Sequence, residues 1–153
     1  MKFFENSPWE ELMSLTAVMQ QKFPQFIQLT RIDRPVGIYL LFWPTITSLW
    51  IAAEGLPSFS LLVVFSLGTV VMRSAGCCIN DYADYEIDGK VRRTQDRPLV
   101  IKKLSKREAL FCFSTLSSLG FCLLLFTNME TILLSFLAIA VIVIYPFMKR
   151  YTN

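Results

Sequence analysis

The stretch FSLLVVFSLGTVVMRSAGCCI, residues 59–79, runs directly into NDYADYEID, residues 80–88. The first part is apolar and, as a helix, long enough to cross about 30 Å of hydrocarbon. The second part carries five acidic or amide side chains within nine residues. Because carboxylates at the edge of a membrane are costly to desolvate, such a cluster usually marks a binding site. The stretch therefore predicts a membrane helix that ends in a polar site.

The rest of the chain contains three more apolar windows of this kind. Each of the four is about 18 to 21 residues long, the length of a membrane span, and they cover residues 36–53, 59–79, 109–127 and 131–148. Arg73 is the only charged residue within them, and 54% of the 153 residues are hydrophobic, which excludes an average soluble protein. We predict an all-α fold of one domain, residues 1–153, built as an integral membrane bundle of four transmembrane helices.

The segment before the first window, residues 1–34, is too polar to span a membrane. Within it, residues 8–30 are amphipathic, so we expect an N-terminal helix that lies flat at the membrane interface. Pro24 lacks a backbone N–H, and we expect it to divide this helix into two pieces. Residues 35–153 then hold the four transmembrane helices.

Lysine and arginine residues are distributed unevenly along the chain. The links at residues 54–58 and 128–130 contain none, whereas residues 81–108 contain eight. Apart from Arg73, the others precede the first window or follow the fourth. By the positive-inside rule, both termini and the Asp-rich and basic loop at 81–108 face the cytoplasm. The lipid bilayer is a predicted partner, and nucleic acid is not, because the basic run is interleaved with carboxylates.

The acidic segment has a spacing that suits a metal ion. If the helix continues past residue 79, Asn80, Asp84 and Asp88 fall at i, i+4 and i+8 on one face. Oxygen ligands in such a row suit a hard divalent cation, above all Mg²⁺ when phosphates supply the remaining ligands. A solvated helix end beside the membrane is the alternative. Arg73, seven residues before Asn80, shares this face and could order the carboxylates, pair within the bundle or reach the interface.

A basic cluster follows the acidic segment at once, between residues 90 and 97. Arg93 and Arg97 are the better phosphate ligands, because a guanidinium group matches phosphate oxygens, and Lys90 is a further candidate. The alternative is simple anchoring to anionic lipid. Metal ligands beside phosphate-binding cations predict a diphosphate site at the membrane surface.

Several motifs in this chain are similar to those of a known family. The chain resembles the UbiA-type intramembrane prenyltransferases. The resemblance covers residues 31–152 and is carried by RIDRPVG at 31–37, LFWPT at 41–45, MRSAGC at 72–77, the Asn-Asp-x-x-Asp-x-x-x-Asp motif at 80–88, RPL at 97–99 and YPFMKRYT at 145–152.

The resemblance implies a helical membrane enzyme with Mg²⁺ as its cofactor. Its expected reaction is the transfer of a polyprenyl group from polyprenyl diphosphate to a ring carbon of 4-hydroxybenzoate, as in ubiquinone synthesis. It assigns Asn80, Asp84 and Asp88 to the metal on the diphosphate, with Asp84 and Asp88 as catalytic residues. Asp81 belongs to the same motif and is expected just outside the ligands.

The resemblance also implies roles near the two ends of the matching region. Tyr145 and Lys149 fit a Tyr-x-x-x-Lys motif, in which Tyr145 binds substrate and Lys149 is catalytic. The adjacent Arg150 fits a catalytic cation on the substrate side. Arg34, at the start of the first span, is a candidate for binding the carboxylate of the aromatic acid.

Two features depart from the family pattern. RPL is followed by Val-Ile-Lys, and a second Asp-rich motif does not occur before Asn153. The chain is therefore expected to be the N-terminal half of the enzyme, which inserts into the membrane and does not catalyse prenyl transfer alone. The alternatives are an inactive membrane fragment, a half-enzyme that needs a complementary chain, or prenylation of another aromatic acceptor in a quinone or haem pathway. Isoprenoid length and oligomeric state stay open.

Overall fold

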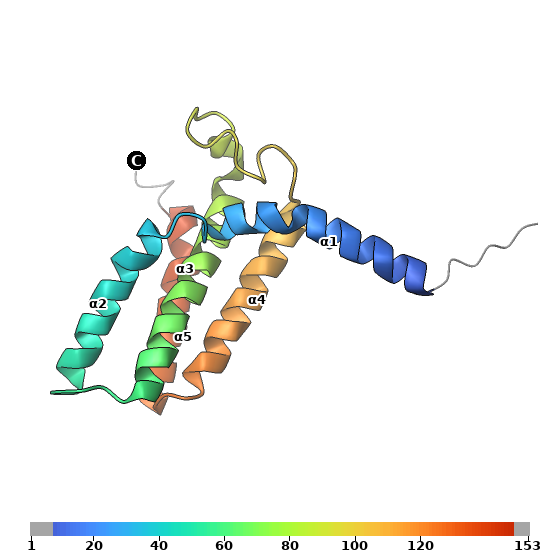
Figure 1. Ribbon diagram of the computed structural model, residues 1–153. Coiled ribbons are helices and arrows are strands. Elements are labelled where there is room, and N and C mark those ends of the chain that lie inside the picture. The colour runs from blue at the N-terminus through green and yellow to red at the C-terminus, as the bar shows by residue number, and fades with distance from the viewer. Residues whose placement is uncertain (1–7, 149–153) are drawn as a thin grey trace, which may run out of the picture.

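The computed structural model describes residues 8–148, with side chains in the first helix at residue 16 and from residue 20 onward. The helices in chain order are α1 (Pro8–Thr30), α2 (Val36–Ala52), α3 (Phe59–Asp88), α4 (Lys106–Leu124) and α5 (Met129–Met148). No strand occurs within residues 8–148. Helices α2 to α5 stand side by side, whereas α1 lies across one end of them and extends away (Figure 1). The predicted all-α fold is confirmed.

The four apolar windows predicted from the sequence each form a helix. Helices α3, α4 and α5 are long and apolar enough to cross a membrane, and α2 is a shorter apolar helix of 17 residues. The protein is therefore an integral membrane protein built from a helical bundle.

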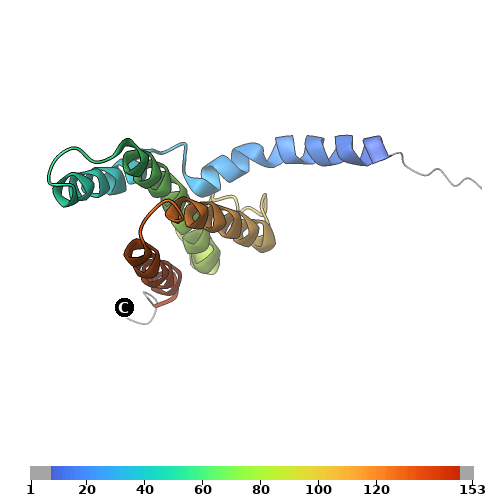
Figure 2. The same ribbon diagram turned by 90° about the horizontal axis from the view of Figure 1, so that it is seen from below.

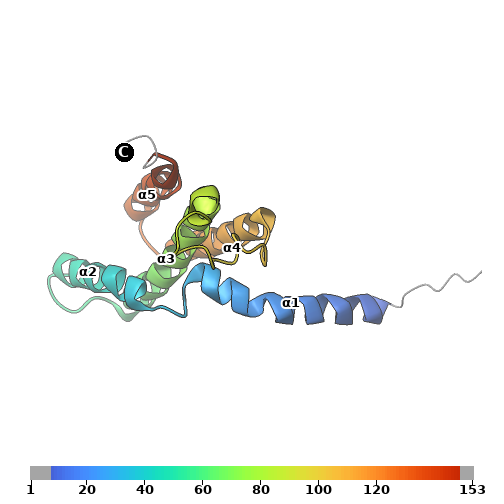
Figure 3. The ribbon, with the colours of Figure 1, turned by 90° about the horizontal axis from the view of Figure 1, so that it is seen from above.

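Helix α3 is the centre of the bundle. It makes the main packing contacts with α1, α2, α4 and α5, and the end-on views show it between α2 and α4, with α5 set to one side (Figures 2 and 3). Gly120 permits a close approach of α4, because a Cβ there would lie 2.6 Å from Met72 Sδ. Side chains on α3 are thus best placed to form a site shared by several helices.

The acidic segment is helical, which is the condition under which Asn80, Asp84 and Asp88 share one face. Helix α3 continues past Ile79 to Asp88, so the predicted loop at 81–108 is shorter and consists of residues 89–105. Helix α4 begins earlier than its apolar window because Ser105 and Glu108 form a capping box. The Glu108 N–H donates to Ser105 Oγ over 3.2 Å, and the Ser105 N–H donates to Glu108 Oε2 over 2.8 Å.

The expected division of the interfacial helix at Pro24 is wrong. Helix α1 runs without interruption from Pro8 to Thr30, with Pro24 inside it. A proline removes one backbone hydrogen bond, here the one to the carbonyl of Gln20. Gln20 is exposed, so water can satisfy that carbonyl and the helix continues.

The buried core lies at the end of the bundle that α1 crosses, here called the polar end. Its fully buried members come from α1, α3, the 89–105 connection and the start of α4, namely Leu29, Cys78, Leu99, Leu104 and Ala109. Because Leu99 and Leu104 fold back into this core, the charged connection is held against the bundle. Most of α2 and α5 is exposed by contrast, as expected for surfaces that face lipid.

Candidate functional site

Two carboxylates of α3 form ion pairs with two arginines at the polar end. The Arg31 Nη2 donates to Asp81 Oδ1 over 2.6 Å, and the Arg97 Nη1 donates to the same oxygen over 3.0 Å. Arg97 Nη1 also donates to Asp88 Oδ2. Both aspartates are buried, with side chains 3% and 9% exposed. These four residues, here called the ion-pair cluster, tie the end of α1 and the 89–105 connection to α3.

Arg31 holds its place in this cluster through an unusual backbone. Its φ angle is 56°, in the left-handed region that glycine usually occupies after a helix. This conformation ends α1 and turns the chain toward α2. A non-glycine residue there costs about 1 kcal/mol, and the ion pair to buried Asp81 offsets that strain. The cluster thus fixes where the interfacial helix joins the bundle.

The three predicted metal ligands follow one another along α3. Asp84 and Asp88 are buried and Asn80 is half-buried. Successive members are one turn, or about 6 Å, apart along the axis, whereas ligands of one Mg²⁺ lie about 2 Å from the ion. A single ion could therefore take one or two of these side chains, with phosphate oxygens completing its shell.

Within residues 8–148, no group of three or more His, Cys, Asp and Glu side chains is placed to hold a metal ion by itself. The oxygen donors of Asn80, Asp84 and Asp88 fit Mg²⁺ that binds together with a diphosphate, which is the usual mode for this ion.

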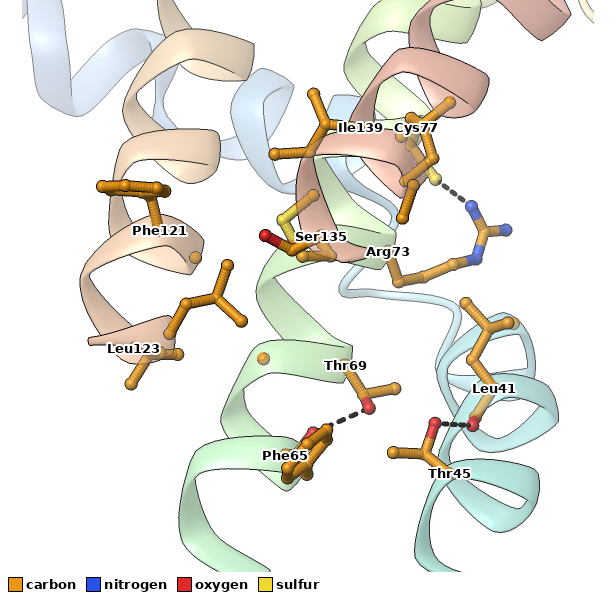
Figure 4. Close-up of a pocket in the computed structure, with 18 of the residues that line it drawn as sticks. Leu41, Thr45, Phe65, Thr69, Arg73, Cys77, Phe121, Leu123, Ser135 and Ile139 are labelled. Atoms are coloured by element: carbon orange, nitrogen blue, oxygen red, sulfur yellow. Dashed lines mark hydrogen bonds between the residues drawn. The ribbon is translucent and has the colours of Figure 1, made fainter. Parts of the chain in front are cut away.

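Below the acidic segment, a cavity of about 970 Å³ lies between α2, α3, α4 and α5. Figure 4 shows side chains from all four helices around it, including Leu41 and Thr45 of α2, Phe65 and Thr69 of α3, Phe121 and Leu123 of α4, and Ser135 and Ile139 of α5. The lining is mostly apolar, and Arg31 and Asn80 contribute polar groups. The cavity therefore begins beside the acidic segment and continues into the membrane-spanning part of the bundle.

Arg73 brings a positive charge into the apolar part of this cavity. Its Nη1 donates to Cys77 Sγ over 2.6 Å, as drawn in Figure 4. Within the described residues it forms no ion pair with a carboxylate. A half-buried cation in a membrane bundle is costly without an anionic partner, so Arg73 is placed to receive an anion.

The remaining predicted site residues lie in three kinds of place. Tyr145 lines the cavity. Lys90 and Arg93 are exposed in the 89–105 connection. Arg34 is 84% exposed, lies 3.7 Å from Asp33 and is not among the residues that line the cavity. Lys149 and Arg150 are outside the described residues and stay predictions from the resemblance.

Sequence reasoning did not assign Arg31 or Arg73 to the site. Nothing local marks Arg31, because its partner Asp81 is 50 residues away. Arg73 had a detectable signal, since it is the only charge within the predicted spans and shares the face of Asn80. The sequence alone does not show where the cavity lies relative to that face, so Arg73 could not be assigned to it.

Comparison with known proteins adds independent information. The UbiA prenyltransferase family matches residues 41–153. The chain is 58% identical over 127 residues to proteins named 4-hydroxybenzoate octaprenyltransferase from Pseudomonas syringae pv. tomato and Pseudomonas aeruginosa, and 56% identical to one from Pseudomonas putida. Each alignment covers 83% of this chain and 43% of the relative, so the chain spans less than half the length of these curated relatives. No solved structure matches the chain significantly.

Proposed function

Because this chain belongs to the UbiA prenyltransferase family, we propose that it serves the transfer of a polyprenyl group from polyprenyl diphosphate to a ring carbon of 4-hydroxybenzoate in ubiquinone synthesis. One observation carries this proposal: the face of α3 that bears Asn80 leads straight into an apolar cavity in which Arg73 forms no ion pair with a carboxylate of the described residues. The acidic end suits a diphosphate, and the cavity suits an isoprenoid and an aromatic anion. The names of the relatives support 4-hydroxybenzoate as the acceptor.

The donor would bind with its diphosphate at the polar end and its tail in the cavity. Asn80, Asp84 and Asp88 would hold Mg²⁺, which neutralises charge on the departing diphosphate. Arg97 is close enough to this segment to contact the same phosphates, and exposed Lys90 and Arg93 could reach them from the connection. The apolar walls would exclude water from the tail.

The acceptor would bind between the diphosphate and Arg73. Arg73 is two turns, or about 10 Å, from Asn80 along α3, which leaves room for a benzene ring. We assign the acceptor carboxylate to Arg73 rather than to Arg34, because Arg34 is 84% exposed and outside the cavity lining. Tyr145 lines the same cavity and is available to contact either substrate.

The chemistry that follows needs few groups from the protein. The bond between the allylic carbon and the diphosphate oxygen breaks, and the electron-rich ring carbon beside the hydroxyl group forms the new bond. That carbon then loses its proton and the ring becomes aromatic again. We assign the proton to a carboxylate or to the released diphosphate.

The proposed location is a bacterial inner membrane, with the polar end in the cytoplasm. Eight Lys and Arg residues in 81–108 and none in the two opposite links support this orientation. Single cysteines placed at exposed positions of the connection, such as Asp96→Cys, should resist a membrane-impermeant thiol reagent in sealed cells. Rapid labelling from outside would contradict the orientation.

The activity is tested directly in membranes that contain the protein. Alone, the chain should give no ring-prenylated product. Co-expressed with the remaining segment of a Pseudomonas relative, it should convert labelled 4-hydroxybenzoate and a polyprenyl diphosphate into that product, and chelation of divalent cations should stop the reaction. If product forms only when the remaining segment of a Pseudomonas relative is co-expressed, the chain is one part of a two-part enzyme. No product in either case, with intact insertion, would favour an inactive membrane fragment and overturn the proposal.

A further inference from the structure

The guanidinium group of Arg73 lies directly on a glycine of the neighbouring helix. A Cβ atom at Gly37 of α2 would lie 2.7 Å from Arg73 Nη2, 2.8 Å from Nε and 3.1 Å from Cζ. Ordinary contacts between heavy atoms are about 3.5 to 4.0 Å long, so any residue larger than glycine would push the guanidinium group away. Both residues line the cavity.

The collision is confined to one side chain. The three atoms nearest to the missing Cβ all belong to the end of the Arg73 side chain, and none belongs to backbone. A longer side chain at residue 37 would therefore displace a flexible group and leave the helix packing intact. Gly37 is also the second residue of α2, where alanine is the better helix former. Glycine at this position is thus explained by the place of the Arg73 guanidinium group and not by the needs of the helix.

We infer that Gly37 is a positioning residue for the aromatic acceptor. Because Gly37 has no side chain, the Arg73 guanidinium group can occupy the space beside it, here called the guanidinium seat. The seat determines where the carboxylate of the acceptor binds. The inference rests on the proposed function, because it takes the acceptor to be an aromatic acid. A second contact fixes the seat from α3, since Arg73 Nη1 donates to Cys77 Sγ over 2.6 Å.

The position of the guanidinium group matters because the acceptor is small and held at both ends. A carboxylate pairs with arginine through a geometry of parallel hydrogen bonds that tolerates little displacement. Moving the guanidinium group by about 1 Å would move the ring relative to the allylic carbon or break the pair, and errors of this size in positioning are costly.

The test compares binding of two ligands to the protein in lipid nanodiscs by titration calorimetry. The ligands are 4-hydroxybenzoate and the neutral 4-hydroxybenzamide, which has the same shape and no charge. Gly37→Ala should weaken benzoate binding about tenfold and leave benzamide binding unchanged. Gly68→Ala is the matched control, because it adds the same methyl group to the same cavity with no atom within 4 Å, and it should keep the wild-type preference for the carboxylate.

A second variant separates positioning from loss of space. In an Arg73→Gln background the guanidinium group is absent, so Gly37→Ala should have no further effect on benzoate binding. A full additional loss in that background, or equal weakening of both ligands, would overturn the inference. So would Gly37→Ala protein that binds benzoate as well as the wild type.

The seat can also be examined without any ligand. The Arg73 Nε–H resonance, assigned by its disappearance in Arg73→Gln, should shift in Gly37→Ala and stay in place in Gly68→Ala. A resonance that Gly37→Ala leaves unmoved would overturn the inference even if the protein transfers no prenyl group. Wild-type protein that binds neither ligand would contradict the proposed function, and a shifted resonance would then still support the seat.

Discussion

The ion-pair cluster and the cavity differ in whether their arginines pair with carboxylates. At the polar end, Arg31 and Arg97 are matched by Asp81 and Asp88, and buried leucines of the connection pack beside them. In the cavity, Arg73 faces apolar walls and pairs with no carboxylate of the described chain. Charges that the protein neutralises itself hold the helices together, whereas a half-buried charge without an anionic partner is suited to a ligand.

Asp88 is a member of the ion-pair cluster and also a proposed metal ligand, so its substitution should have the largest effect. Asp88→Ala removes a proposed metal ligand and one partner of Arg97, so prenyl transfer should fall at least about a hundredfold, as when a preorganised charge is deleted from other active sites. The assay is product formation in membranes that also contain the remaining segment of a Pseudomonas relative. Asp96→Ala, which removes an exposed acid of the nearby 89–105 connection, is the control and should retain activity. Similar rates for the two variants would remove Asp88 from the site.

Asp81 should contribute most to the free energy of unfolding, because Arg31 and Arg97 both form ion pairs with it. Asp81→Asn leaves Arg31 without its carboxylate and Arg97 with Asp88 alone, and it should lower the free energy of unfolding by about 3 kcal/mol. Unfolding of the detergent-solubilised protein measures this. Glu130→Gln, at an exposed position in the first turn of α5, should change it by less than about 0.5 kcal/mol. Equal stabilities would show that the cluster contributes nothing to the fold.

Arg73, in contrast to Asp81, should contribute to ligand binding and not to stability. Arg73→Gln should weaken 4-hydroxybenzoate binding at least about tenfold, as expected for a lost charged hydrogen-bond partner, without lowering stability. Arg34→Gln, which changes an exposed arginine, should alter that affinity less than about twofold. Titration of both variants in nanodiscs provides the measurement. A stronger effect at Arg34 would return the carboxylate to the site first predicted for it.

The smallest effect is expected where an ion pair is half-exposed. Lys22 of α1 lies 2.6 Å from Glu108 of α4, with side chains 37% and 29% exposed. Because water screens such a pair, Lys22→Met should cost less than about 1 kcal/mol in unfolding free energy. A loss as large as that of Asp81→Asn would mean that exposure does not distinguish the two sets of ion pairs.

The membrane-spanning elements could be predicted because their signals are local. Apolar windows of the right length predicted helices α2 to α5, of which α3, α4 and α5 are long and apolar enough to span a membrane. The predicted loop was wrong for residues 81–88, because α3 continues to Asp88. Helix α4 begins three residues before the predicted window, because the capping box of Ser105 and Glu108 starts the helix ahead of the apolar residues.

The arrangement of the site depends on contacts between distant parts of the chain. Arg31 pairs with Asp81 across 50 residues, and no periodicity in the sequence signals that contact. Among several cations in the connection, Arg97 is the one on the aspartates, since Leu99 and Leu104 anchor its neighbourhood in the core. Likewise, only the placement of α2 against α3 reveals that Gly37 faces Arg73.

The length of α3 has a consequence for how a substrate would arrive. Its 30 residues extend about 45 Å, whereas the hydrocarbon layer is about 30 Å thick. The excess is about the length of the acidic segment, so Asn80 to Asp88 would stand at the depth of the lipid phosphates. A polyprenyl diphosphate carries its own phosphates at that same depth. It could therefore reach the protein by lateral diffusion within one leaflet, and its occupancy would follow its mole fraction in the membrane rather than any concentration in water.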